Sequence, residues 1–227
     1  TYSVQNPSAI RSIVMTDADV PVEVLSSGDG SMYADYFESE KETYDIEIEG
    51  DTLYIRKRIQ FMVGIFRLRR NPEDIKLTMH LPVGYNGEVS IATADGGISV
   101  LGVTMAGLAI KAVDGNITLN RTHINGGAVC KTIDGDIVVG SITAAEASLK
   151  TTDGDIVLDR PLISNRLSCR TTDGGIKGVL AGRASDYDFT VRTVDGRSNI
   201  VSGGSGRTAF EAKTTDGSIE VFFEDAD

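Results

Sequence analysis

Apolar and polar positions alternate along most of the chain, and from residue 87 onward they do so in a repeat. An Asp-Gly pair recurs at intervals of 19 to 22 residues, with alternating apolar and polar side chains on either side. Such alternation is typical of a strand with one buried face. The aspartates of the pairs are Asp95, Asp114, Asp134, Asp153, Asp173, Asp195 and Asp216. We expect each repeat to be a strand, an Asp-Gly corner, a second strand and a looser return.

Aligned on the aspartate, the repeats form columns of like residues. The position four residues before the aspartate is apolar and is occupied by Ile91, Ile110, Cys130, Leu149, Cys169, Val191 and Ala212. The position three residues after it is isoleucine in six repeats, namely Ile98, Ile117, Ile137, Ile156, Ile176 and Ile219. The repeat of Asp195 carries Ser198 there instead, and we expect an insertion at its turn.

Two architectures fit this pattern. An Asp-Gly pair between alternating runs is a strong signal for an antiparallel hairpin, so a meander of hairpins must be considered. A β-solenoid explains the columns better, because its stacked coils place equivalent residues above one another at about 4.8 Å. We therefore predict an all-β fold, a single-chain β-solenoid of the β-helix or β-roll type, with about seven coils of 19–22 residues.

The Asp-Gly pairs are structural turns in this fold. We expect the carboxylate to accept backbone N–H groups of its turn and the glycine to adopt a positive φ. The glycines are Gly96, Gly115, Gly135, Gly154, Gly174, Gly196 and Gly217. A column of threonines precedes the turns and points inward. Its hydroxyls should bond along the stack or to neighbouring backbone, because a buried hydroxyl needs a partner.

The first third of the chain differs from the rest. Residues 1–86 lack the repeat but keep alternating segments, so we expect an irregular, strand-rich N-terminal section or cap, followed by the regular repeats of residues 87–227 in one continuous domain. Residues 56–70 carry six basic side chains around an apolar run. This stretch is either a hairpin that contacts an anionic membrane surface or two strands joined at Gly64 whose charges are solvated.

Composition narrows the functional classes. The net charge of −11 argues against nucleic acid as a partner. The sequence has no apolar run of 18 residues and no export signal at its start, so we expect no membrane span in it. Cys130 and Cys169 share an inward column with Leu149 between them, too far apart for a disulfide, and should be free, buried thiols.

A row of basic residues is the most informative candidate site. Three residues before six of the aspartates stand Lys111, Lys131, Lys150, Arg170, Arg192 and Lys213. At about 4.8 Å in water, each pair of neighbouring charges costs on the order of 1 kcal/mol before screening by salt. One interpretation is that acidic side chains on adjacent columns compensate and that the charges protect strand edges. The other is a groove that binds an anionic polymer, because regular charge spacing matches a repeating ligand.

Catalysis and metal binding find less support. A row of aspartates suggests calcium, but the nine-residue motif of calcium-binding β-rolls does not occur. The only histidines, His80 and His123, accompany neither a nucleophile motif nor a second ligand. We predict no catalytic residue, no cofactor and no metal site. A polysaccharide-active enzyme remains an alternative, because β-helices host such enzymes although a fold does not imply a function.

The repeated phrase itself resembles a known family. After a strand-rich start ending in "KLTMHLP" come "KAVDGNI", "KTIDGDI", "KTTDGDI", "RTTDGGI" and "KTTDGSI", and only "RTVDGRSNI" departs from the phrase. Over essentially the whole chain this resembles the bacterial putative adhesin family with β-strand repeats. The resemblance implies a β-solenoid and, commonly, an extracytoplasmic domain attached to a membrane anchor.

We therefore predict a non-catalytic binding or structural module, displayed at a bacterial cell surface and membrane-anchored in the full-length protein. Its partner is left open between an anionic envelope polymer, such as a wall glycan, and a protein. The alternatives are a polysaccharide-active β-helix enzyme and a scaffold of a membrane-associated signalling complex.

Overall fold

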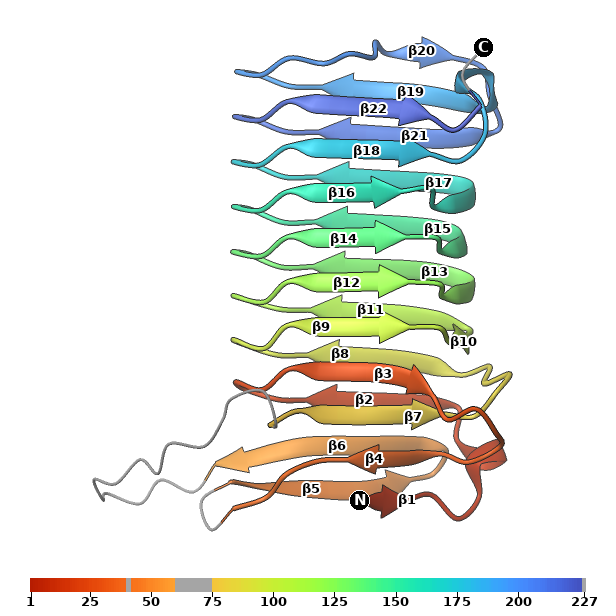
Figure 1. Ribbon diagram of the computed structural model, residues 1–227, viewed down its shortest axis with the longest axis vertical. Helices are drawn as coiled ribbons and strands as arrows, with labels where there is room; N and C mark the ends of the chain where they lie inside the picture. The colour runs from red at the N-terminus through yellow and green to blue at the C-terminus, as the bar shows by residue number, and fades with distance from the viewer. Residues whose placement is uncertain (40–41, 60–74, 226–227) are drawn as a thin grey trace, which may run out of the picture.

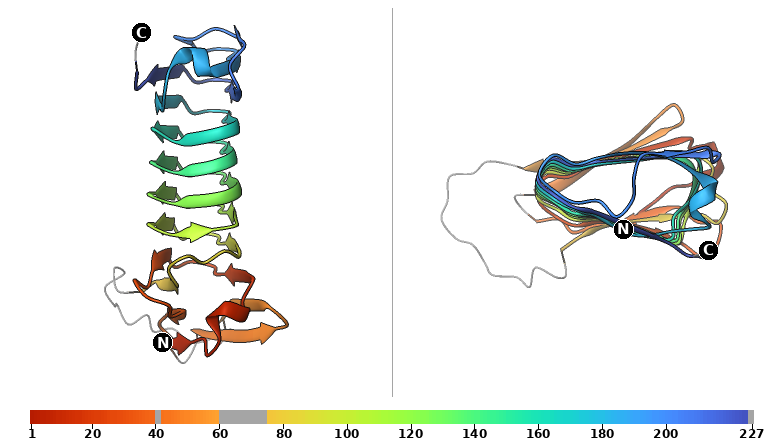
Figure 2. Two further views of the ribbon diagram at one scale, coloured as in Figure 1. Left: turned by 90° about the vertical axis from the view of Figure 1, so that its right-hand side faces the viewer. Right: turned by 90° about the horizontal axis from the view of Figure 1, so that it is seen from above.

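The computed structural model describes residues 1–39, 42–59 and 75–225. Two long sheets face one another, and seen along the axis the coils overlie one another as a flattened ring (Figures 1 and 2). The described residues contain no α-helix, only the short 3-10 turns η1 (Pro7–Ala9) and η3 (Ala184–Asp186). The prediction of an all-β solenoid is confirmed.

The strands follow one another along the stack in an order that differs from their order in the chain. Sheet one contains, from end to end, β1 (Tyr2–Ser3), β4 (Tyr33–Asp35), β7 (Leu77–Leu81), β3 (Val22–Ser26), β9 (Ile98–Leu101), β12 (Ile117–Asn120), β14 (Ile137–Gly140), β16 (Ile156–Asp159), β18 (Ile176–Leu180) and β22 (Ile219–Phe223). Sheet two contains, from the opposite end, β20 (Gly203–Gly204), β19 (Tyr187–Arg192), β21 (Thr208–Lys213), β17 (Leu162–Arg170), β15 (Thr143–Lys150), β13 (His123–Lys131), β11 (Gly107–Lys111), β8 (Glu88–Ala92), β2 (Ser12–Thr16), β6 (Thr52–Ile59) and β5 (Glu42–Glu49), and β10 (Thr104–Met105) also pairs with β13.

The sequence columns are physical columns in the structure. Parallel pairing places Ile110 beside Cys130 in sheet two and Ile117 beside Ile137 in sheet one. All six isoleucines that follow the corners are buried, with exposed fractions of 0–1%. Burying each of these side chains contributes about 1.5–3 kcal/mol, so the isoleucine column is a principal support of the stack.

The corner glycines have a different role from the predicted one. Eight other glycines among the described residues have a positive φ, but none of the Asp-Gly glycines does, so the prediction of a left-handed corner is wrong. The constraint comes instead from the neighbouring coil. A Cβ on Gly135 would lie 2.2 Å from the carbonyl oxygen of Gly115, and one on Gly154 would lie 2.1 Å from that of Gly135. Only glycine lets one corner stack directly on the next.

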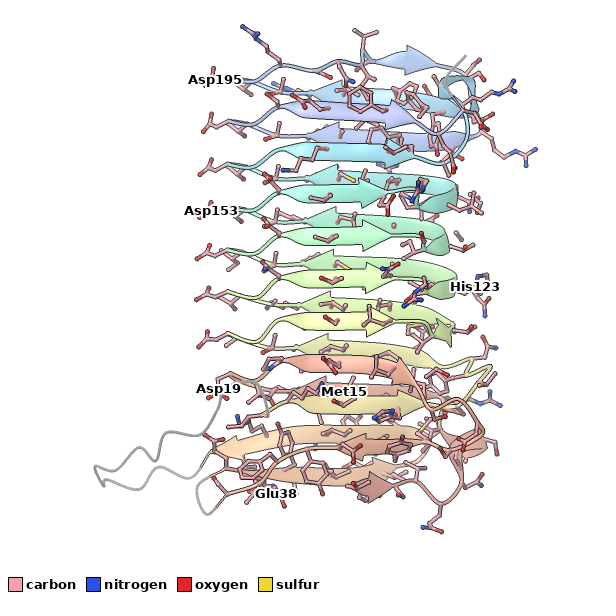
Figure 3. All side chains as sticks on the ribbon, viewed as in Figure 1. Met15, Asp19, Glu38, His123, Asp153 and Asp195 are labelled. Carbon is pink, nitrogen blue, oxygen red and sulfur yellow. The ribbon has the colours of Figure 1, made fainter. Side chains whose placement is uncertain are left out.

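The corner aspartates also act differently from expectation. Their backbone N–H groups donate to the coil below, as from Asp134 to the carbonyl of Val113 at 2.9 Å, whereas their carboxylates are exposed and accept no hydrogen bond within the described residues. Figure 3 shows Asp153 and Asp195 at this outer edge of the stack. The prediction that these carboxylates cap their own turns is therefore wrong. The backbone N–H groups of the turn already donate to carbonyl groups of the neighbouring coil.

In the repeats of Asp114, Asp134 and Asp153, the residue after the Asp-Gly pair supplies a side-chain cap between coils. Asn116 accepts the N–H of Asp136, Asp136 accepts that of Asp155, and Asp155 accepts that of Gly175, each at 2.8 Å. A hydrogen bond from Lys177 and the one from Gly175 hold the pKa of Asp155 below its usual range. Asp136 and Asp155 therefore join successive coils.

The inward threonines bond along the stack as predicted. Thr132 donates its hydroxyl to the carbonyls of Val113 and Gly115 at 3.2 and 3.0 Å. The equivalent bonds to corner glycines measure 2.8 Å and join Thr151 to Gly135, Thr171 to Gly154, Thr214 to Gly174 and Thr193 to Gly217. The glycine carbonyl that leaves no room for a Cβ is thus also the acceptor for the next coil.

The two cysteines are free and buried, as predicted. Leu149 pairs with Cys130 on one side and with Cys169 on the other, so one strand separates the thiols. Burial raises the pKa of Cys130 to about 12, which keeps the thiol protonated and unreactive.

The coils at both ends of the stack are out of sequence order. β21 lies between β17 and β19, although β19 comes first in the chain. At the other end, β2 lies between β6 and β8, and β3 lies between β7 and β9 (Figure 1). The strands β2 and β3 near the N-terminus and β21 near the C-terminus are therefore each enclosed between two neighbours, whereas the last strand, β22, is the end strand of sheet one.

The corner of the coil formed by β2 and β3 is organised around a buried carboxylate. Asp17 takes the place of the inward threonine, and its Oδ1 accepts the N–H groups of Ala18, Asp19 and Val20 at 2.7, 3.1 and 3.2 Å. Its Oδ2 accepts the Tyr44 hydroxyl of β5. This residue thereby ties β5, the end strand of sheet two, to the coil of β2 and β3.

A substitution at one corner glycine tests the stacking constraint. We expect Gly135→Ala to lower the free energy of unfolding by about 3 kcal/mol, because the two corners must separate to admit the Cβ. Gly97→Ala is the matched control: its Cβ would meet only the Asn116 carbonyl, at an ordinary 3.6 Å. Urea unfolding of both variants measures the difference, and equal losses would show that the close approach is not the constraint.

Candidate functional site

The basic row forms a continuous ladder on the outer face of sheet two. Lys111 pairs with Lys131, Lys131 with Lys150 and Lys150 with Arg170. The order then departs from the sequence, because Arg170 pairs with Lys213 of β21, and Lys213 pairs with Arg192 of β19. The structure therefore brings all six predicted residues together, in neighbouring strands.

A shallow groove of about 440 Å³ lies beside this row. Lys131, Lys150 and Arg170 line one side, and Glu146 and Arg166 line the other. Its floor includes Val129, Ser148 and Ser168, which belong to a central column of outward residues that pair from strand to strand. Beyond the groove this column continues to Ala109 in one direction and to Glu211 and Thr190 in the other. The groove is thus open along the stack and bordered by cations.

Two smaller hollows continue the same surface toward the C-terminal end. One, of about 410 Å³, is lined by Lys150, Arg170, Arg192 and Lys213 together with threonines of the corners. The other, of about 290 Å³, is lined by Arg166, Glu211 and Lys213 among others. The three hollows share their cationic residues and form one extended surface.

Glu211 is the functional candidate that sequence reasoning missed. Its side chain is only 7% exposed, and its carboxylate contacts Arg166 at 2.5 Å, Arg170 at 2.6 Å and Lys213 at 2.5 Å. Ser168 lies 3.5 Å away. The hydrogen bonds from Lys213, Arg166 and Arg170 hold the pKa of Glu211 at about 2 despite its burial. The signal in the sequence was a single carboxylate in a column otherwise composed of small residues.

Glu211 neutralises only one end of the basic row. Among the described residues, Lys111, Lys131 and Lys150 have no carboxylate within ion-pair distance, whereas Arg170 and Lys213 share that of Glu211. The repulsion expected from the sequence is therefore relieved near β21 and left uncompensated between β11 and β15. An anionic ligand would therefore relieve the most charge repulsion between β11 and β15.

The basic stretch 56–70 is described only up to Ile59, and its remaining residues lie outside the described ones. Arg56 pairs with Glu47, and Arg58 pairs with Asp45 across the β5–β6 hairpin. The Lys57 side chain is 2% exposed and contacts Asp19 and Glu42, with Asp17 at 3.6 Å. These three cations are therefore engaged within the protein.

The described residues hold no group of three or more His, Cys, Asp or Glu side chains arranged for a metal ion. His80 stacks on Tyr33 at 4.2 Å, and His123 is exposed at the edge opposite Asp153 (Figure 3). His80 also lies 3.5 Å from the carboxylate of Asp35.

Comparisons with known proteins agree with this architecture. The profile of the family described as Toastrack DUF4097 matches residues 10–227. A structure described as a putative adhesin from Parabacteroides distasonis is similar at 15% identity with a TM-score of 0.54, and one from Bacteroides fragilis at 16% with 0.52. Each match covers 93% of this chain and 92% of the other. At this identity the likeness shows the fold.

No curated protein matches the chain. Among the described residues, no helix is long and apolar enough to span a membrane.

The pH dependence of stability tests the contacts of Glu211. Because the folded-state pKa of about 2 lies below the unfolded value near 4.3, the ionised carboxylate stabilises the fold above about pH 5, and this contribution is lost as the pH falls toward 2. We expect Glu211→Gln to lower the free energy of unfolding at pH 7 by about 1–3 kcal/mol and to have little effect near pH 2.

Denaturant unfolding at a series of pH values provides the measurement. Glu146→Gln is the control, because it removes an exposed carboxylate from the same face without these ion pairs. If Glu211→Gln lowers the free energy of unfolding by the same amount from pH 7 down to pH 2, the ionised carboxylate is not the source of the stabilisation.

Proposed function

We propose that this protein, which belongs to the Toastrack DUF4097 family, is a non-catalytic binding module displayed at the surface of a bacterial cell. Its ligand is an anionic polymer of the cell envelope that lies along the groove of sheet two. The single observation that carries this proposal is the ladder of Lys111, Lys131 and Lys150, which has no carboxylate partner among the described residues.

The placement at the cell surface rests on the resemblance and on the similar structures. The two similar structures with TM-scores above 0.5, from Parabacteroides distasonis and Bacteroides fragilis, are both described as putative adhesins. We extend that description to this chain as part of the proposal, with attachment to a membrane in the full-length protein. Proteolysis of intact cells tests it, because a surface-displayed solenoid is accessible to added protease and an internal one is not.

The geometry supports a ligand that is linear and repeating. Successive cations of the row stand one strand apart, at about 4.8 Å, so their spacing is regular along the axis of the stack. The floor of the groove is formed by small side chains, so a chain can lie close to the sheet. A single small anion would use one or two of these cations, whereas an extended polymer uses the whole ladder.

A non-catalytic role is supported by the side chains around the groove. Among the described residues, Glu146 is the one acidic side chain that lines it, and Glu211, at its end, is ionised and held by three cations. Glu211 therefore has no proton to donate near neutral pH. A glycan-cleaving site needs one carboxylic acid and one carboxylate on either side of the scissile bond.

Charge reversal in the ladder tests the proposal. We expect Lys131→Glu with Lys150→Glu to weaken the binding of polygalacturonate, a linear polyanion, by at least about tenfold at low ionic strength. Arg121→Glu with Arg160→Glu is the control, because it changes the net charge equally at exposed positions outside the groove. Surface-immobilised polymer and a salt series measure the affinities. Equal losses in both double variants would contradict a binding site at the ladder.

A further inference from the structure

We propose that Glu211 competes with the ligand for the cations of the basic row. Its carboxylate occupies, on β21, the position that a carboxylate of the bound polymer takes on the neighbouring strands β17, β15 and β13. This inference rests on the proposed function and deepens it, because it assigns the chemistry of the ligand and the point at which the binding row ends. It commits to a linear polycarboxylate that runs along the stack.

The position of Glu211 in the central column carries the first step. In sheet two, Glu211 pairs directly with Ser168, which pairs with Ser148, which pairs with Val129. The same place on the sheet surface therefore holds a carboxylate in β21 and a small or apolar side chain in β17, β15 and β13. Where the side chain is small, the groove of about 440 Å³ is open.

The contacts of Glu211 carry the second step. Its carboxylate is largely covered, with 7% of the side chain exposed, and bridges the two sides of the groove. Arg166 approaches from one side, and Arg170 and Lys213 approach from the other. This is a complete carboxylate-binding arrangement, with cations supplied by two neighbouring strands and a serine hydroxyl nearby.

The strands β13 and β15 repeat one side of this arrangement without its carboxylate, whereas the place of Arg166 is taken by Gly127. Lys131 and Lys150 stand beside Ser148 as Arg170 and Lys213 stand beside Glu211. Neither lysine has a carboxylate partner among the described residues, and both line the open groove. A carboxylate of a ligand placed over Ser148 would meet Lys131 and Lys150 in the places that Arg170 and Lys213 hold beside Glu211. The opposite side carries Glu146 there, so the ligand would bind through the lysine side of the groove.

The competition follows from the shared cations. Arg170 lines the groove and also binds Glu211, so a ligand that extends past Lys150 must compete with an internal carboxylate for it. The binding row therefore ends at Lys150 in the wild-type protein. Removing the carboxylate frees Arg166, Arg170 and Lys213 and lengthens the row toward Arg192.

Glu211→Ser tests this directly, because serine is the residue that the two strands below carry in the same column. We expect polygalacturonate to bind this variant about five- to tenfold more tightly than the wild type at pH 7, with a steeper dependence on salt because more cations take part. Glu211→Gln, which keeps the size of the side chain, should show the same direction and serves if the serine variant unfolds. Thermal unfolding of each variant confirms the fold.

Two further probes test the chemistry of the ligand. Fully methyl-esterified polygalacturonate has no charge and should not bind any variant. Inorganic polyphosphate carries regularly spaced charges on phosphate groups instead of carboxylates. Glu211→Ser should therefore raise its affinity less than it raises that of polygalacturonate. Equal or larger gains for polyphosphate overturn the assignment to carboxylates.

The outcomes separate this inference from the proposed function. If the wild type binds polygalacturonate through Lys131 and Lys150 but Glu211→Ser leaves the affinity unchanged or lowers it, the competitor role is wrong and the binding groove stands. If the wild type binds neither polyanion, the proposed ligand class is wrong and the inference falls with it.

Discussion

The direct stacking of equivalent backbone at a distance of one strand is the constraint on which the rest of the structure depends. It requires glycine at the corners, because a Cβ on Gly135 would overlap the carbonyl of Gly115. It also places the isoleucines in one continuous buried column and gives the inward threonines from Thr132 onward acceptors in the neighbouring coil. Backbone hydrogen bonds, apolar burial and satisfied hydroxyls thus all follow from the same repeat.

The same constraint turns outward side chains into ladders. A basic residue repeated at one position becomes a row of like charges about one strand apart, which is unfavourable unless counter-charges stand nearby. Glu211 supplies that counter-charge where Arg166, Arg170 and Lys213 converge. Elsewhere along the row the described residues supply none, and this difference between two parts of one surface is the basis of the function that we propose.

The arrangement of strands at the ends of the stack protects the terminal coils from fraying. A solenoid whose terminal coil is also its outermost coil can fray from the chain end, because that coil has only one neighbour. In this protein β21 is enclosed between β17 and β19, and β2 between β6 and β8. The side chains of Ser202 and Asn199 bond backbone groups of Val191 and Val221, so part of the last edge is also satisfied.

The sequence by itself determined the solenoid, the buried columns and the basic row, because each is a property of periodicity, and equivalent positions must coincide wherever coils stack. It could not indicate that Lys213 lies beside Arg170 or that Glu211 binds three cations. Columns of like residues fit equally well in several orders, so local pattern does not specify which coil is the neighbour. The corner glycines show the same limit. Turn rules predicted that glycine stands there because its φ is positive, but its φ is not positive. Glycine is required because a Cβ would overlap the neighbouring coil, and only the tertiary structure decides that contact.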